Sequence, residues 1–171
     1  MTPAPTMPPL TLVVAMDEQR LIGAGGGLPW RLPEDLKHFR RITLGHIVLM
    51  GRRTWDSLGK PLDGRDNWVL SRDEGFRPAG ARVFATLNEA LRAAGTRELM
   101  VIGGAQLFAE TLPRARRIEL TEVHARLAGD TWFPEFDRGA WREVQRERRE
   151  PDPRHAHAIS FVTLERTLAG R

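Results

Sequence analysis

Short, almost wholly apolar runs recur along the chain. Residues 10–16 (LTLVVAM), 46–50 (HIVLM) and 98–102 (ELMVI) have the length and composition of central strands buried on both faces of a parallel sheet. Shorter runs that also fit strands lie at 67–70, 83–85 and 117–124, whereas residues 21–27 and 130–134 are expected to form loops. Residues 141–148 and 158–166 instead alternate between apolar and polar, which predicts an antiparallel hairpin at the end of the chain.

Between these runs, apolar residues recur at helical spacing. Residues 87–94 have this spacing and are followed by Gly95, a common residue just after a helix end. Leu107, Phe108 and Leu112 predict another helix after a Gly-Gly pair. Strands alternating with helices are typical of an α/β fold built on a parallel sheet.

A further helix is predicted to begin at about Pro33, because proline suits the first helical position. At about 100° per residue, Leu36, Phe39 and Ile42 share one face, and Asp35 falls in the middle of that arc. An ionised carboxylate directed inward is costly unless a group pairs with it. Asp35 is therefore a candidate functional acid, although a lone Asp at this position also fits a simple cap or dipole partner.

A glycine-rich loop precedes this helix. It contains Gly23 and residues 25–27, and it leads into Leu28 and Trp30, two large apolar side chains. Glycine permits tight or mobile backbone, and binding loops commonly have this character. The segment predicts a lid that excludes water from a site beside Asp35.

Two predicted strands end at glycines that open helices. Gly51 is followed by Arg52 and Arg53, and residues 103–104 form a Gly-Gly pair. Helix starts of this kind favour anionic ligands, and Ser71 and Arg72 follow another strand at the edge where ligands gather in α/β sheets. The alternatives are that the arginines are ordinary exposed residues and that Gly-Gly is only a tight connection.

Composition narrows the classes of protein. The 171 residues suit one domain, expected at 10–168, after a flexible, proline-rich tail at 1–9. Cysteine is absent, which excludes disulfides, thiolate metal sites and thiol nucleophiles. No apolar run approaches the ~20 residues that span a membrane, so a cytoplasmic protein is expected. His155 and His157 are expected in a solvated loop, with no metal site.

The formal charge is +4, and Lys37 and Lys60 are the only lysines. A positive charge carried mainly by arginine is a feature of nucleic-acid-binding proteins. A nucleic-acid partner is disfavoured because the arginines are spread among acids and because the densest cluster, residues 142–149, alternates with glutamates. One inward carboxylate, a lid and several phosphate-type helix starts instead suit hydride transfer from a phosphorylated cofactor.

These motifs occur in an order that resembles bacterial dihydrofolate reductase. The resemblance is carried by residues 22–23, 28–39 (LPWRLPEDLKHF), 50–57 (MGRRTWDS), 61–65 (PLDGR), 101–104 (VIGG) and 129–131 (GDT). It implies NADPH-dependent reduction of 7,8-dihydrofolate to tetrahydrofolate. It also implies a single α/β domain with an eight-stranded, mostly parallel sheet, a C-terminal antiparallel hairpin and about four flanking helices. The protein would act as a monomer, and antifolates such as methotrexate or trimethoprim would inhibit it.

The resemblance also implies roles for residues on the substrate side. Asp35 would bind the pterin amino group and ring nitrogen and promote protonation of N5. Trp30 would hold a water near Asp35, and Thr121 would support the carboxylate from behind. Leu28 would close over the nicotinamide. Arg65 would pair with the substrate's α-carboxylate, and Lys60 would lie near that tail. The walls of the pterin and aminobenzoyl pocket would be Val13, Leu36, Phe39, Leu58 and Ile102.

Cofactor contacts are implied in the same way. The nicotinamide end would be met by Ala15, Leu21, Ile22, Gly23, Gly26 and Gly27. The adenosine phosphates would be met by Gly51, Arg52, Arg53, Thr54, Ser71 and Arg72, and the pyrophosphate region by Gly103, Gly104, Ala105, Gln106 and Phe108. The bond between Gly103 and Gly104 is expected to be cis. Arginines at these positions favour NADPH over NADH, because its additional 2′-phosphate needs cationic partners.

This chain departs from the family pattern at three places. Phe108 replaces a frequent tyrosine, Ala105 replaces a third glycine, and residues 25–27 are richer in glycine than the usual lid. Two alternative functions remain at this point: a same-fold reductase of another heterocycle, of the riboflavin-pathway type, and a non-catalytic folate or nucleotide-binding module. Retention of Asp35, Trp30 and Arg65 together argues against the binding module, and Arg65 with the motif at residues 30–39 disfavours the other reductase.

Overall fold

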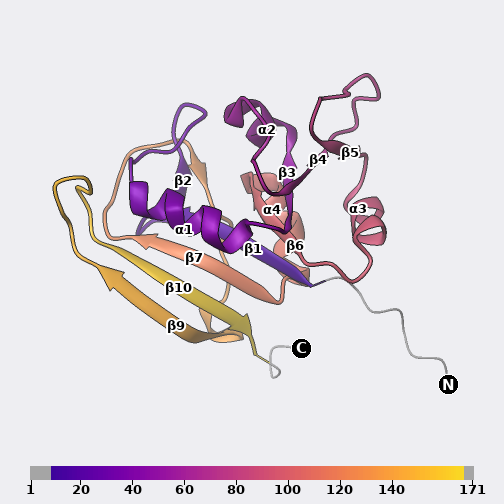
Figure 1. The fold of residues 1–171 in the computed structure, drawn as a ribbon. Coiled ribbons are helices and arrows are strands. Elements are labelled where there is room, and N and C mark those ends of the chain that lie inside the picture. The colour runs from indigo at the N-terminus through magenta and orange to yellow at the C-terminus, as the bar shows by residue number, and fades with distance from the viewer. Residues whose placement is uncertain (1–8, 168–171) are drawn as a thin grey trace.

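The computed structural model describes residues 9–167, so residues 1–8 of the predicted tail and residue 168 of the predicted domain lie outside the described residues. An eight-stranded sheet runs in the order β5-β4-β3-β6-β1-β7-β10-β9 (Figure 1). Its strands are β1 (Leu10–Met16), β3 (Ile47–Gly51), β4 (Asp66–Leu70), β5 (Arg82–Phe84), β6 (Leu99–Gly103), β7 (Arg117–Val123), β9 (Trp141–Arg149) and β10 (Ile159–Arg166).

Strand direction follows the predicted division of the sheet. All pairs from β5 across to β7 are parallel, whereas β10 pairs antiparallel with both β7 and β9. The fold prediction of a mostly parallel sheet with a C-terminal antiparallel hairpin is confirmed. The carboxyl ends of β1, β3 and β6 lie together in the middle of the sheet, which is where ligands bind in such folds.

Four α-helices connect the strands: α1 (Pro33–Thr43), α2 (Arg52–Leu58), α3 (Leu87–Ala94) and α4 (Ala105–Thr111). Short 3₁₀ turns occur at Leu112–Arg114 and Arg138–Ala140. The helix predicted at 87–94 is confirmed at both ends, because Thr86 caps its start and Gly95 follows it. None of the helices between residues 9 and 167 is both long and apolar enough to cross a membrane.

The sheet separates two apolar layers. Even-numbered residues of β1 join the main core with Leu107, Phe108 and Phe133 on the α4 side. A smaller cluster of Leu32, Val123, Ile159 and Phe161 lies on the α1 side, and a third surrounds Val48, Met50 and Val69. Because successive strand residues point to opposite faces, Val13 and Ala15 face the side that carries α1 (Figure 1).

Two short strands were not predicted. Leu21–Gly23 forms β2 and Thr131–Trp132 forms β8, and the two pair antiparallel in a separate small sheet. Both segments were predicted to be loops. That prediction is wrong because three-residue and two-residue strands are too short to show an alternating pattern, and their pairing joins segments far apart in the sequence.

Candidate active site

The start of α1 places Asp35 against the sheet. The helix begins at Pro33 as predicted, and Asp35 is only 8% exposed. Its Oδ1 accepts a hydrogen bond of 2.7 Å from the Thr121 hydroxyl of β7. Thr121 is paired with Ala15 of β1, so both residues face α1. The inward carboxylate expected from helical spacing is therefore present, and a side chain of the sheet holds it.

Burial dominates the electrostatics of this carboxyl. Removal from water raises the pKa of Asp35, and the Thr121 hydrogen bond opposes that rise by stabilising the ionised form. Burial has the larger effect, so the pKa is raised overall. A carboxyl with a raised pKa holds a proton at higher pH than an ordinary aspartic acid, which suits a group that handles protons.

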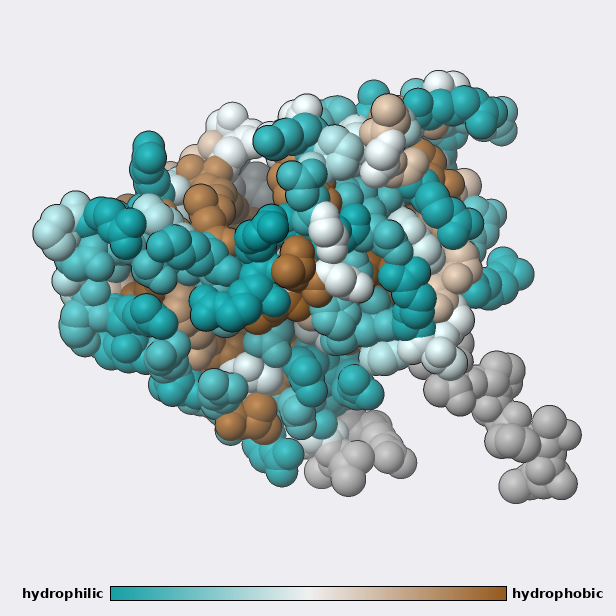
Figure 2. Space-filling view, viewed as in Figure 1, coloured by the Kyte–Doolittle hydropathy of each residue, from teal (hydrophilic) through white to brown (hydrophobic). Residues whose placement is uncertain are grey.

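Large apolar side chains remain exposed beside this acid. Leu28 and Leu36 are both 55% exposed, whereas Val13 is buried and Phe39 is half-buried. Leu36 was expected on the apolar face of its helix, but it projects into solvent rather than into the core. Figure 2 shows apolar side chains around a hollow on the face that carries α1 and α2. Exposed leucines near a buried acid are typical of a ligand site.

Trp30 lies between the lid and α1. Its ring packs against the cluster of Leu32, Val123, Ile159 and Phe161. Its Nε1 is buried, and no described residue accepts a hydrogen bond from it. Buried indole N–H groups normally have a hydrogen-bond partner, so Trp30 Nε1 is a candidate donor to a ligand or a bridging water.

The lid is fastened at its tip. Gly25 N–H donates to Asp130 Oδ2 at 3.1 Å, and Asp130 N–H donates to the Gly23 oxygen at 3.0 Å. Ala24 and Gly27 exchange two backbone hydrogen bonds, which close a tight turn. The Gly25 contact is also the largest cause of the lowered pKa of Asp130. Sequence reasoning included Asp130 in a family motif but did not predict it as a lid contact.

The predicted cofactor residues gather at two strand ends. Arg52 is fixed at the start of α2, where its guanidinium lies 3.7 Å from the Phe76 ring and its Nε lies 3.2 Å from Asp56. Arg53 and Arg72 are exposed and form no ion pair or hydrogen bond with any residue from 9 to 167. Two free guanidinium groups near a fixed one provide an anion-binding surface.

A second turn approaches the same surface. The bond between Gly103 and Gly104 is cis, as predicted. A Cβ added to Gly103 would lie 3.0 Å from Thr54 Oγ1, so the start of α2 packs closely on this turn, and the φ of +142° at Gly103 also favours glycine. Thr54, Gly103 and Gly104 are thus brought together. Ala105 and the exposed Gln106 begin α4 beyond them.

Other predicted residues lie at the margins. Arg65 donates from Nη1 to Thr43 Oγ1 at 3.2 Å and lies 5.9 Å from the Phe39 ring, whereas Lys60 is exposed. Phe108 is buried in the main core, 5.1 Å from the Phe133 ring, so little of its surface is open to a cofactor. Leu21 of β2, a predicted cofactor contact, is buried and offers little surface to a ligand. The remaining predicted residues are half-buried: Ile22 in β2, Leu58 in α2, Ser71 after β4 and Ile102 in β6.

One histidine prediction is wrong. His155 was expected in a solvated loop, but its side chain is buried, and its Nε2 accepts a hydrogen bond of 3.0 Å from the Glu34 N–H of α1. The sequence carries no local signal for this contact, because the two residues are 121 positions apart. No group of three or more His, Cys, Asp or Glu within residues 9–167 is arranged to hold a metal ion.

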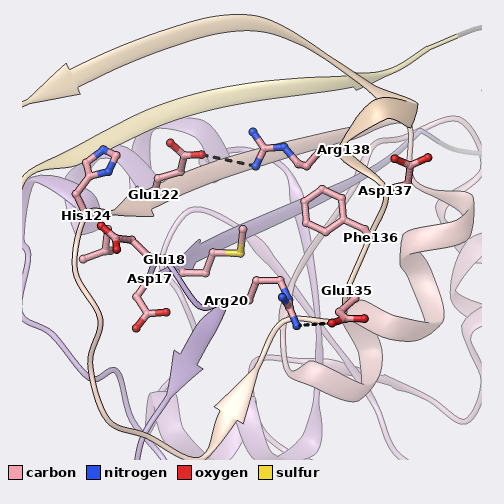
Figure 3. A pocket seen from close by; sticks show the side chains of 11 residues that line it. Asp17, Glu18, Arg20, Glu122, His124, Glu135, Phe136, Asp137 and Arg138 are labelled. Atoms are coloured by element: carbon pink, nitrogen blue, oxygen red, sulfur yellow. Dashed lines mark hydrogen bonds and ion pairs between the residues drawn. The ribbon is translucent and has the colours of Figure 1, made fainter.

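A separate cavity lies on the other face of the sheet. It has a volume of about 750 Å³ and is lined by charged side chains of both signs (Figure 3). Met16 and Glu122 line it, and they alternate with Ala15 and Thr121, so they point away from Asp35. The ion pairs Arg20–Glu135 and Arg138–Glu122 span it. Because none of the predicted site residues lines this cavity, the site is the surface beside Asp35.

Comparison with known proteins finds relatives that cover most of this chain. A family model described as dihydrofolate reductase matches residues 9–166. Dihydrofolate reductase type 3 of Salmonella typhimurium is 44% identical to this chain, and the match covers 92% of this chain and 98% of the relative. Dihydrofolate reductase of Mycobacterium tuberculosis is 50% identical, and the match covers 77% of this chain and 83% of the relative. The structure of dihydrofolate reductase from Enterococcus faecalis complexed with NADP(H) and RAB-propyl superposes with a TM-score of 0.88 at 31% identity, covering 95% of this chain and 99% of that one.

Proposed function

The chain belongs to the dihydrofolate reductase family, and from that premise we propose which of its residues carry out the NADPH-dependent reduction of dihydrofolate to tetrahydrofolate. The observation that carries the assignment is the buried pair of Asp35 and Thr121, 2.7 Å apart, beside two exposed leucines. A binding module for nucleotides has no need for such an acid at this cost in desolvation.

Asp35 is proposed to anchor the pterin and to promote its protonation. The ionised carboxylate pairs with the amino group and adjacent ring nitrogen of the substrate, which are donors that match its two oxygens. Burial raises the pKa of Asp35, so the protonated form persists to higher pH than in an ordinary aspartic acid and favours a proton at N5. Thr121 is proposed to orient the carboxylate rather than to touch the substrate.

The lid and Trp30 are proposed to control water. Leu28 is exposed and lies two residues before Trp30, so closure of the lid would move this side chain over the reacting rings. The buried Nε1 of Trp30 is the donor proposed to hold one water near Asp35. The proposed apolar walls of the substrate pocket are Val13, Leu36, Phe39, Leu58 and Ile102. The proposed contacts to the carboxylate tail of the substrate are Lys60 and Arg65.

The residues at the other strand ends suit NADPH. When bound, NADPH supplies the hydride that reduces the pterin ring. Arg52, Arg53 and Arg72 provide cationic groups for its phosphates, and glycines at residues 51, 103 and 104 leave the backbone open to close approach. On the same grounds we propose cofactor contacts at Thr54, Ser71, Ala105 and Gln106. The other cofactor contacts are proposed on the family resemblance alone: Ala15, Leu21, Ile22, Gly23, Gly26, Gly27 and Phe108.

We further propose that the domain extends from residue 10 to 168 and acts as a monomer in the cytoplasm. The family model covers residues 9–166, which supports one domain. Dihydrofolate is the proposed substrate partner, and antifolates such as methotrexate or trimethoprim are proposed to compete for the same surface beside Asp35. The relative from Enterococcus faecalis was solved with NADP(H) and RAB-propyl, which supports binding of a second ligand beside the cofactor.

The assignment is tested by Asp35→Asn in a stopped-flow assay of NADPH oxidation with dihydrofolate. Hydride transfer is expected to fall by about 10²-fold or more at neutral pH, the typical contribution of a positioned acid, while NADPH affinity by fluorescence titration stays unchanged. Glu110→Gln, an exposed carboxylate of α4, is the control and should behave as wild type. Equal loss of NADPH binding and turnover in Asp35→Asn would contradict the role given to Asp35.

A further inference from the structure

The helix that carries Asp35 has no capping side chain of its own. Its N-cap residue, Leu32, offers no side-chain acceptor, and Pro33 has no N–H. The N–H groups of Asp35 and Leu36 both reach the Leu32 carbonyl oxygen, at 3.0 and 3.2 Å. Glu34 N–H is therefore the first-turn donor that needs a partner from another part of the chain.

His155 provides that partner. Its Nε2 accepts the Glu34 N–H at 3.0 Å, and its ring is buried. The ring is held by a tight turn between β9 and β10, in which Asp152 and His155 exchange two backbone hydrogen bonds of 3.0 Å. The C-terminal hairpin thus fixes the helix start one residue before the carboxylate of Asp35.

Asp152 selects the form of the ring that can make this contact. Its Oδ1 lies 2.8 Å from His155 Nδ1. An imidazole nitrogen accepts a hydrogen bond only when it carries no proton, so the contact with Glu34 requires a neutral ring whose proton is on Nδ1 and points to Asp152. The same interaction holds the pKa of Asp152 below its usual range, because the carboxylate accepts a hydrogen bond from the ring.

We propose that His155 is a positioning residue for the reduction: in its neutral form it caps α1 and keeps Asp35 in place against Thr121. The proposal rests on the role assigned to Asp35 above. Protonation of the ring would direct a second N–H at the N–H of Glu34 and add positive charge at the positive end of the helix dipole. The first turn of α1 would then lose its cap, and the position of Asp35 would be less defined.

The other charges near the ring do not replace this interaction. Glu34 Oε1 and Oε2 pair with Arg154 and Arg149, at 3.3 and 3.8 Å, so these three side chains largely satisfy one another. A cavity of about 180 Å³ borders the ring and gives solvent protons access to it. The charged and titratable groups that face His155 are Glu34 of α1, Arg149 and Glu150 at the end of β9, and Asp152, Arg154 and His157 of the loop.

The first test uses the full-length wild-type protein and nitrogen-15 NMR. The expected result is a neutral His155 with its proton on Nδ1, and a Glu34 amide resonance that shifts together with the His155 ring as the pH is lowered. A ring with its proton on Nε2, or a Glu34 amide that does not respond when the ring is protonated, would overturn the proposal.

The second test compares His155→Ala and His155→Asn in pre-steady-state hydride transfer across pH. The alanine variant removes the cap, and the rate is expected to fall about tenfold, as modest misplacement of a reacting group does, with unchanged NADPH affinity. The asparagine side chain can also accept the Glu34 N–H, so this variant is expected to restore the rate. His157→Ala is the matched control and should keep the wild-type profile.

Identical rates and pH profiles in wild type, His155→Ala and His155→Asn would overturn the positioning role. If the alanine variant does not fold, the asparagine profile and the NMR titration decide. The two proposals also fail separately. Full activity of Asp35→Asn would remove the premise, whereas a slow Asp35→Asn together with unaffected His155 variants would refute only the part given to His155.

Discussion

Replacing Thr121 with valine should expose the cost of the buried carboxylate. The substitution keeps the shape of the side chain and removes the hydroxyl that donates to Asp35 Oδ1 at 2.7 Å. A hydrogen bond to a charged group contributes about 1.5–3 kcal/mol, whereas one between neutral groups contributes about 0.5–1.5 kcal/mol. Since both side chains are buried, water cannot easily replace the lost donor. The free energy of unfolding is therefore expected to fall by about 1.5–3 kcal/mol where Asp35 is ionised.

The chain offers a matched control for this substitution. Thr111 is also buried, and its hydroxyl donates at the same distance, 2.7 Å, to the carbonyl oxygen of Leu107. Thr111→Val removes a bond to a neutral acceptor, so its cost should be smaller and independent of pH. Urea unfolding of the two variants and wild type over a range of pH gives both quantities, provided the m-value is constant.

The pH dependence supplies the refuting result. The Thr121 hydroxyl lowers the pKa of Asp35, which means that it stabilises the ionised form more than the protonated one. The cost of Thr121→Val should therefore be greatest above the folded-state pKa of Asp35 and should shrink as the pH falls through it. The midpoint of the pH profile for hydride transfer should also move upward. A cost equal to that of Thr111→Val at every pH would refute the reasoning.

Three further predictions follow from the site. Asp35→Asn is expected to unfold at a higher temperature than wild type at neutral pH, because a carboxyl with a raised folded-state pKa loses its stabilising contribution as pH rises. The difference in unfolding temperature should disappear as the pH falls below about 4, where the carboxyl of the unfolded chain is protonated as well. Asp130→Ala is expected to speed hydrogen exchange at the Gly25 amide, whose acceptor it removes, and unchanged exchange would show that the lid is held otherwise. Arg52→Ala is expected to weaken NADPH binding by about tenfold or more while changing NADH binding little, since only NADPH carries the 2′-phosphate. An unchanged preference for NADPH over NADH in a binding titration would assign the phosphate contact to another arginine.

Local sequence pattern was sufficient where a residue's role depends on its neighbours. The spacing of Leu36, Phe39 and Ile42 placed Asp35 on the inner side of its helix, and the structure buries it. The continuous apolar run at 10–16 predicted β1 at both of its ends. These signals are strong because helix and strand periods repeat over several residues.

Pattern failed where partners are distant in sequence. Thr121 entered only through the family resemblance, since nothing near it indicates a carboxylate 86 positions away. His155 was assigned to solvent because its surroundings are polar and rich in proline, and only the folded hairpin brings it to α1. Long-range pairing leaves no period in the sequence.

The position of β1 has a consequence for how the chain acquires its fold during synthesis. This strand is made well before its two neighbours, β6 and β7, which begin at Leu99 and Arg117. A ribosome-bound chain that ends before β6 therefore carries an apolar strand with both edges unpaired, which is a state prone to aggregation. Such distant pairing also slows folding. Molecular chaperones that shield residues 10–16 would be expected to raise the yield of folded enzyme more than those that act on the locally closed C-terminal hairpin.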